Sequence, residues 1–319
     1  PILAVGILGY GISMFLFGLA TELWMLFVIR ALGGILSAAT LPTTYAYISD
    51  STSEEERGGA IGIVGAATGL GMMLGPGLGG WLARDSLSIP FFVTAGFCLL
   101  TLVLIWLMLP ESLSASSRQS ASIDPKQNVQ IGELKSALFS PIGTLLIMAL
   151  LVSFGLSNFQ SIFGLYALDK FGYGPDEVGW ILTFVGIVAA LTQGLLTGRL
   201  TKRWGEVMLI KVTLLLSASG FILMLLANTL WSVILTTGLF ILPNALLRPA
   251  VISLTSKRAT VGEGVVMGLN NSFTSIGRII GPLWAGFVFD LNFNLPYLSG
   301  SIIMLFGFFV SLIWFIQVT

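Results

Sequence analysis

Histidine is absent from this sequence of 319 residues, and cysteine occurs once, as Cys98. A single cysteine excludes an internal disulfide, and the lack of histidine removes the usual ligands of zinc and haem and the base of a serine-type triad. Charge is also scarce, because only 9% of the residues are charged, against about 25% in a soluble globular protein. We therefore expect no metal centre, no cofactor and no enzymatic activity.

The few charges balance, with 15 Lys and Arg against 15 Asp and Glu. A net charge of zero provides no attraction to nucleic acid, so no nucleic-acid partner is expected. Apolar residues are abundant instead: 55% of the chain is hydrophobic and the mean hydropathy is +0.95. This composition predicts a protein whose first partner is the lipid bilayer.

Apolar runs long enough to cross a membrane recur along the whole chain. A bilayer core of about 30 Å needs about 20 helical residues. Ten such runs lie near 1–20, 23–49, 59–83, 90–110, 141–168, 178–200, 207–227, 230–255, 264–289 and 296–317. Only the polar stretch at 111–140 separates them widely, which is typical of a linker. The sequence predicts an all-α membrane protein with four helices in a bundle over 1–110, a cytoplasmic linker over 111–140, and six helices in a bundle over 141–319.

Positive charge is divided unequally between the two sides of the predicted membrane. One side collects ten basic residues, Arg57, Arg118, Lys126, Lys135, Arg199, Lys202, Arg203, Lys211, Lys257 and Arg258. The other side has two, Arg84 and Lys170. Because short loops rich in Lys and Arg stay in the cytoplasm, both termini are predicted to be cytoplasmic. Pro1 is predicted to lie on the cytoplasmic side, and four helices are followed by six. This arrangement predicts a fragment of a protein with two bundles of six helices, in which the first two helices are missing.

Two glycine-proline cassettes, GMMLGPGLGG at 71–80 and GRIIGPLWAG at 277–286, lie 206 positions apart (277 minus 71). At that offset Gly58, Gly62, Gly71, Gly75, Pro76 and Gly80 coincide with Gly264, Gly268, Gly277, Gly281, Pro282 and Gly286. The coincidence indicates an internal duplication with both copies in the same orientation. Gly71, Gly75 and Gly79 would clear one stripe of a helix that Pro76 bends. Such a helix suits rocking against a neighbour, although static helix packing produces the same stripe.

These cassettes resemble motifs of the drug/proton antiporters of the major facilitator superfamily. The first cassette matches G-x-x-x-G-P-x-x-G-G of their fifth helix, and LFVIRALGG at 26–34 resembles their fourth-helix motif, with Gly33 at the usual Gln. The stretch GRLTKRWGE at 198–206 is similar to their loop motif between helices eight and nine, with Lys202 at the usual acidic position and Glu206 at the usual basic position. The segments SFGLSNFQSIFGLY, LLRPA and MGLNNSFTSIGRIIGPLWAGFVFD look similar to the multidrug efflux pumps of Gram-positive bacteria, the NorA and Bmr group.

The resemblance implies a monomeric secondary transporter of the major facilitator fold in the cell (plasma) membrane. It would export hydrophobic or amphipathic drugs in exchange for protons by alternating access. The motif residues implied to carry the conformational change are Gly71, Gly75, Pro76, Gly79, Gly80, Gly198, Arg203, Gly205, Gly277, Gly281 and Pro282. A metabolite or sugar transporter of the same fold, and a truncated membrane protein that does not transport, remain as alternatives.

Arg30, Arg248 and Arg278 are the ionisable residues predicted to lie deep in the spans, where an unpaired charge costs about 2.5 to 3.5 kcal/mol. The resemblance links Arg30 to proton coupling, and snorkelling to the headgroups is the alternative. Relatives carry carboxylates where this chain has Gln160 and Ala245, so the proton carrier would be Asp50, a residue of the missing first helix, or none.

Substrate contacts are expected from amide, aromatic and guanidinium side chains that would line a cavity at mid-membrane. Asn270, Thr274 and Arg278 form a polar helical stripe that predicts either such a lining or a seam between helices. The predicted substrate-binding residues are Arg30, Asn158, Gln160, Phe163, Tyr166, Asn244, Asn270, Phe273, Thr274 and Arg278. Any single aromatic among them could instead serve packing.

Overall fold

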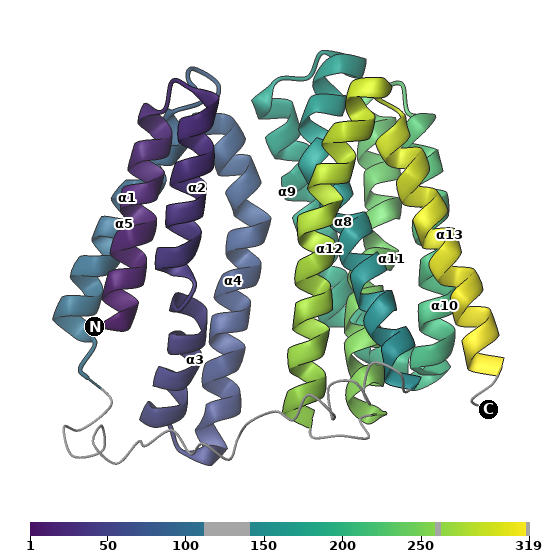
Figure 1. The fold of residues 1–319 in the computed structure, drawn as a ribbon, viewed down its shortest axis with the longest axis horizontal. Helices are drawn as coiled ribbons and strands as arrows, with labels where there is room; N and C mark the ends of the chain where they lie inside the picture. Colours follow the sequence, from purple (N-terminus) through teal and green to yellow (C-terminus); the bar gives the residue numbers. More distant parts are fainter. Residues whose placement is uncertain (112–140, 259–262, 317–319) are drawn as a thin grey trace. The chain divides into compact units, whose positions relative to one another are not determined.

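The computed structural model describes residues 1–111, 141–258 and 263–316, and within these ranges every regular element is a helix (Figure 1). The predicted linker, apart from Glu111, lies outside the described residues. The chain divides into two compact units, Pro1–Pro125 and Lys126–Thr319.

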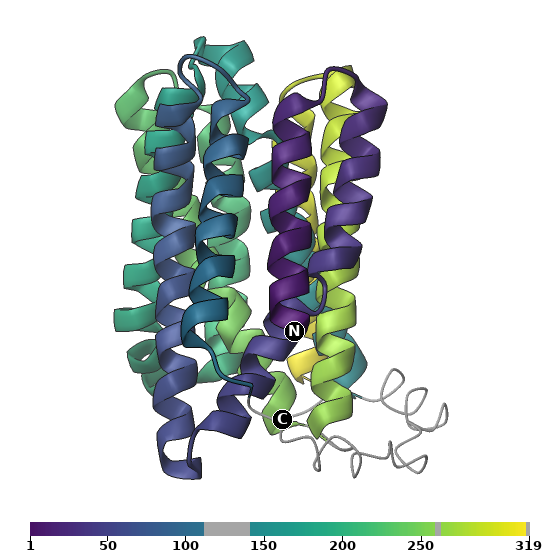
Figure 2. The ribbon, with the colours of Figure 1, turned by 90° about the vertical axis from the view of Figure 1, so that its left-hand side faces the viewer.

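The first unit is built around α1. Its helices are α1 (Ile2–Leu19), α2 (Leu23–Ser37), α3 (Thr40–Ser51), α4 (Glu54–Leu82) and α5 (Ile89–Met108). Glycines let α1 approach its neighbours closely: a Cβ atom at Gly11 would lie 2.9 Å from Cβ of Cys98 on α5, and one at Gly9 would lie 2.5 Å from Cβ of Leu36 on α2. After a break at residues 38 and 39, α3 follows α2 toward the same end of the unit (Figure 1), and Figure 2 shows it tilted away from the axis of α2.

The second unit contains the larger core. Its elements are α8 (Pro141–Phe171), α9 (Pro175–Leu191), the π-helix η1 (Thr192–Thr197), α10 (Gly198–Leu225), α11 (Leu230–Lys257), α12 (Glu263–Leu291) and α13 (Leu295–Ile316). Fully buried rings join α8, α10 and α11, since Phe240 lies with its ring centroid 4.9 Å from that of Phe159 and 4.4 Å from that of Phe221. Their packing fixes which face of α8 points inward.

Helix packing in the two units repeats at the offset of 206 found in the sequence. Adding 206 to the bounds of α1, 2–19, gives 208–225, which is the part of α10 after Gly205. The same addition to α5, 89–108, gives 295–314, within α13. The α1 helix packs extensively on α5, and α10 packs extensively on α13. The same pairing of helices at the same offset supports the internal duplication.

Membrane spans are fewer than the sequence count. The described helices include eight candidate spans, so the predicted ten are not confirmed. Two predicted runs, 178–200 and most of 207–227, fall in one candidate of 51 residues, Pro175–Leu225. Within it, Gly205 has non-helical backbone angles, φ 72° and ψ 161°, so the chain kinks there, between the two predicted runs. The run at 264–289 lies in α12, which is not among the candidates, since its Asn, Ser, Thr and Arg residues lower its hydropathy.

Candidate functional site

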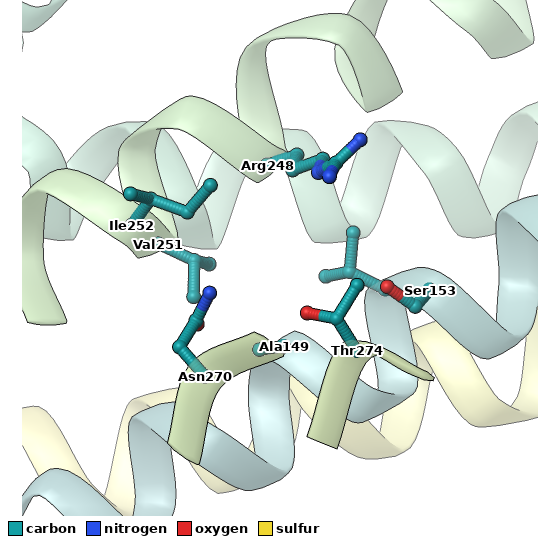
Figure 3. A pocket seen from close by; sticks show the side chains of 8 residues that line it. Ala149, Ser153, Arg248, Val251, Ile252, Asn270 and Thr274 are labelled. Carbon is teal, nitrogen blue, oxygen red and sulfur yellow. The ribbon is translucent and has the colours of Figure 1, made fainter. Parts of the chain in front are cut away.

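A small pocket lies within the second unit, where α8, α11 and α12 meet (Figure 3). Its lining residues are Ala149, Val152 and Ser153 of α8, Arg248, Val251 and Ile252 of α11, and Asn270 and Thr274 of α12. The cavity volume is about 10 Å³, which is about the space that one water molecule requires. The pocket can therefore hold one small polar group and no complete drug molecule.

Three polar side chains of this pocket are almost fully buried. Asn270 is 4% exposed, and Ser153 and Thr274 are each 7% exposed. The Oδ1 atom of Asn270 has no hydrogen-bond partner. Because a buried polar atom without a partner is costly, this amide favours the arrival of a water or of a polar ligand group. Figure 3 shows the side chain of Asn270 rising from α12 toward α11.

One arginine lines the pocket, and a second lies near it on α12. Arg248 lines the pocket from α11, and Arg278 lies on α12 one helical turn beyond Thr274; both side chains are exposed. The two guanidinium groups are close enough to repel each other. In the described part of the chain, neither group has an ion pair with a carboxylate.

Two glycines of the second cassette determine how α12 meets α8. A Cβ atom at Gly277 would lie 2.5 Å from the carbonyl oxygen of Leu150 and 2.9 Å from the amide nitrogen of Phe154, and one at Gly281 would lie 2.9 Å from the Phe154 carbonyl oxygen. The two backbones therefore touch along this seam. The predicted polar stripe is divided by it: Asn270 and Thr274 line the pocket, whereas Arg278 is exposed.

The first cassette has no comparable contact. A Cβ atom at Gly71, Gly75 or Gly79 of α4 would meet no atom within 4 Å in the described structure, although Gly80 is buried. Pro76 and Pro282 both lie inside uninterrupted helices, α4 and α12.

The aromatic and amide residues predicted on α8 separate into two groups. Phe163 and Tyr166 are each 1% exposed and belong to the core of the second unit. Asn158 is also buried and donates from Nδ2 to the carbonyl oxygen of Pro296, at 2.7 Å, so it joins α8 to α13. Gln160 is exposed. The structure thus places Phe163, Tyr166 and Asn158 among packed helices and Gln160 away from them.

The other predicted binding residues are scattered. Asn244 is buried on α11 and donates to the carbonyl oxygen of Phe240 in its own helix. Phe273 is half-buried and packs against a small apolar cluster of α8 and α12. Arg30 on α2 and Asp50 on α3 belong to the first unit, and both are exposed.

The predicted loop motif at 198–206 places a charged contact at the end of α11. Gly205 has a φ of +72°, which favours glycine, and it directs Glu206 toward α11. Glu206 forms an ion pair with Lys257 and accepts a hydrogen bond from Oγ of Ser253 at 3.0 Å. Gly198 begins α10 and Arg203 is exposed.

Sequence reasoning missed some of these residues. Ser153 of the pocket carried no signal, because it is one small polar residue in an apolar run. Lys257 had a signal that could have identified it, since it is a basic residue at the end of a span opposite an acidic loop residue.

Comparison with known proteins identifies relatives along nearly the whole chain. The sequence profile of the Major Facilitator Superfamily matches residues 1–156 and 145–318. Multidrug resistance protein 2 of Bacillus subtilis (strain 168) is 34% identical over 310 residues, which cover 97% of this chain and 78% of that protein. Multidrug resistance protein 1 of the same organism is 34% identical over 319 residues, 98% of this chain and 79% of that protein. Quinolone resistance protein NorA of Staphylococcus aureus (strain COL) is 28% identical over 312 residues, with 98% and 79% covered.

Solved structures share the fold at lower sequence identity. A POT family transporter in complex with 5-aminolevulinic acid has a TM-score of 0.76 and 14% identity, with 99% of this chain and 80% of that chain covered. A bacterial homolog of the human lysosomal transporter Spinster, inward-facing and occupied, has a TM-score of 0.71 and 16% identity, with 99% and 81% covered.

Proposed function

The chain belongs to the Major Facilitator Superfamily, and on that basis we propose that it is a secondary active transporter that exports hydrophobic or amphipathic drugs. It is an all-helical, multi-pass membrane protein whose family moves small molecules. The observation that carries the proposal is the 34% identity, over 97% of the chain, to a multidrug resistance protein.

The proposed mechanism is alternating access between an N-terminal bundle, 1–110, and a C-terminal bundle, 141–319, joined by a cytoplasmic linker. Each bundle would move largely as a rigid body, with the cassette helices at its moving surfaces. The protein would work as a monomer in the cell membrane with both termini in the cytoplasm.

Exchange for protons is the proposed driving force, since each charge that crosses 100 mV supplies about 2.3 kcal/mol. Arg30 and Asp50 are the proposed coupling residues of the first unit. Asp50 would take up and release the proton, and Arg30 would respond to its charge. Asp50 lies near the end of α3, which is a position that water can reach.

Dye transport into everted membrane vesicles tests the proposal. Vesicles from cells lacking their own drug pumps, with and without the expressed chain, are energised, and the accumulation of two cationic dyes, ethidium and rhodamine 123, and of one anionic dye, carboxyfluorescein, is followed. We expect at least one of these dyes to accumulate only with the chain, and this accumulation to be lost when an ionophore collapses the pH gradient. Accumulation of all three dyes equal to that of the empty vesicles overturns drug export. Accumulation that the ionophore does not affect retains drug export and overturns proton exchange.

A metabolite transporter of the same fold is the second candidate. It is favoured by residue 160, where the drug-pump resemblance implies a carboxylate and this chain has Gln160, which is exposed and cannot titrate. Dye-resistant growth of expressing cells would favour the first candidate, and growth on an added metabolite without dye resistance would favour the second.

A further inference from the structure

The geometry points to a substrate class: the pocket between α8, α11 and α12 binds the anionic group of an amphipathic substrate, a carboxylate or a similar oxyanion. The compounds exported would then carry a negative charge next to an apolar body. This inference rests on the proposed transport function and concerns only which substrates the second unit selects.

The arrangement of charge favours an anion. Arg248 lines the pocket, Arg278 lies on α12 one helical turn beyond the pocket residue Thr274, and no described carboxylate pairs with either one. Guanidinium groups have only donors and match an oxyanion with paired hydrogen bonds. An oxyanion between the two guanidinium groups would replace their mutual repulsion by an attraction to each of them. Such charge-assisted hydrogen bonds are stronger than those between neutral groups. A cationic ligand would add a third positive charge.

A buried amide also faces the pocket, since Asn270 lines it and is 4% exposed. Its Oδ1 has no partner and, as an acceptor, would take a donor such as water, so only its NH2 group could serve an anion. Figure 3 shows its amide nitrogen directed toward α11 and the hydroxyl of Thr274 directed toward the same space. The NH2 of Asn270 and the hydroxyl groups of Thr274 and Ser153 can donate to an anionic oxygen.

The size of the cavity limits what can enter it. A cavity of about 10 Å³ accepts one small group, so only the anionic end of a ligand would enter and the apolar body would remain outside. Acidic residues, which a cationic drug would require, are absent from the described lining of the pocket. The described acids of the unit whose side chains can be placed lie at or near the ends of helices or at the Gly205 kink: Asp169, Asp176, Glu177, Glu206 and Asp290.

Binding of matched dyes to the purified full chain tests the inference. Carboxyfluorescein and rhodamine 123 share a ring system and differ in charge, so both are titrated by fluorescence anisotropy into protein held in nanodiscs of phosphatidylcholine. We expect the anionic dye to bind at least tenfold more tightly. Arg248→Gln and Arg278→Gln are each expected to lower the affinity for the anionic dye about tenfold. The affinity for the cationic dye is expected to stay unchanged or to rise.

Controls separate a binding role from a loss of folding. Arg199→Gln removes an exposed arginine of the same unit whose described hydrogen bond goes to the Leu195 carbonyl oxygen of η1, and it is expected to bind both dyes as the unaltered chain does. If Arg248→Gln does not fold, Asn270→Leu is used instead, because it removes the buried amide without removing a charge. It must also lower the affinity for the anionic dye alone.

The outcomes distinguish this inference from the proposed function. Equal affinity for both dyes, or preference for the cation, overturns the inference even if vesicles export drugs. Anion binding that depends on Arg248, in a protein that exports no dye, supports the pocket and overturns drug export. The same oxyanion chemistry occurs in lipid headgroups: if phosphatidylglycerol in the nanodiscs displaces the anionic dye while phosphatidylcholine does not, the pocket is a lipid site and the substrate inference is overturned.

Discussion

Replacing Gly277 by alanine should destabilise the second unit, because the structure leaves no room for a Cβ atom there. The added carbon would lie 2.5 Å from the carbonyl oxygen of Leu150 and 2.9 Å from both the amide nitrogen of Phe154 and Cβ of Ser153. Two of these three atoms belong to backbone, so no rotamer change can relieve the overlap. The helices α8 and α12 would have to separate along their seam.

The magnitude combines two opposing effects. Alanine favours a helix over glycine by about 1 kcal/mol, whereas overfilling a packed interface costs typically about 1 to 3 kcal/mol. Contact with two backbone atoms places this site at the upper end, so the net loss should be about 1 to 2 kcal/mol. For a domain of this size, each kcal/mol lowers the Tm by about 2 to 4 °C.

Thermal unfolding in detergent, followed by tryptophan fluorescence, measures the effect. The matched control is Gly268→Ala on the same helix, since a Cβ atom at Gly268 would meet no atom of the described residues within 4 Å. It should unfold at the temperature of the unaltered chain or slightly above. A Gly277→Ala protein as stable as the Gly268→Ala protein would refute the close contact between α8 and α12.

Two further predictions concern contacts between helices. Asn158→Leu should lower the free energy of unfolding by about 0.6 to 1.7 kcal/mol, because it removes the bond to the Pro296 carbonyl oxygen; unchanged stability with weaker dye binding would instead indicate a substrate role. Glu206→Lys should reduce vesicle transport by placing two positive charges together, and adding Lys257→Glu should restore it by reversing the ion pair; a double variant no better than the single one would contradict a role for the pair.

Sequence alone predicted the fold well where the signal was long or repeated. The apolar runs and the cassette at two places identified helices and an internal duplication, and α1 and α5 indeed pair as α10 and α13 do. The number of spans was harder to predict from the sequence. The two runs that the sequence separates between residues 200 and 207 lie in one candidate span, which contains the non-helical kink at Gly205. The polar residues of α12 remove that helix from the candidate spans.

The candidate site was harder to predict, because apolar residues cover α8 on every side. Residue spacing then gives no indication of which face is buried. Phe163 and Tyr166 were grouped with Gln160 by chemistry, yet the first two lie in the core and Gln160 is exposed. On α12 the polar stripe did indicate a face, and Asn270 and Thr274 line the pocket. Periodicity located a site only where polar and apolar residues alternate along the helix.

The two cassettes show that one sequence pattern can occupy two different mechanical settings. In α12 the glycines at 277 and 281 touch the backbone of α8, and close-packed interiors resist separation. We therefore expect α8 and α12 to move as one body, with Asn270, Thr274 and Arg278 carried along at fixed distance from α8. In α4 a Cβ atom at the equivalent glycines, Gly71 and Gly75, would meet no described atom within 4 Å, so within the first unit this stripe makes no close helix contact. If the cassette supports movement, the movement occurs at an open stripe such as that of α4 rather than at the seam that α12 has already closed.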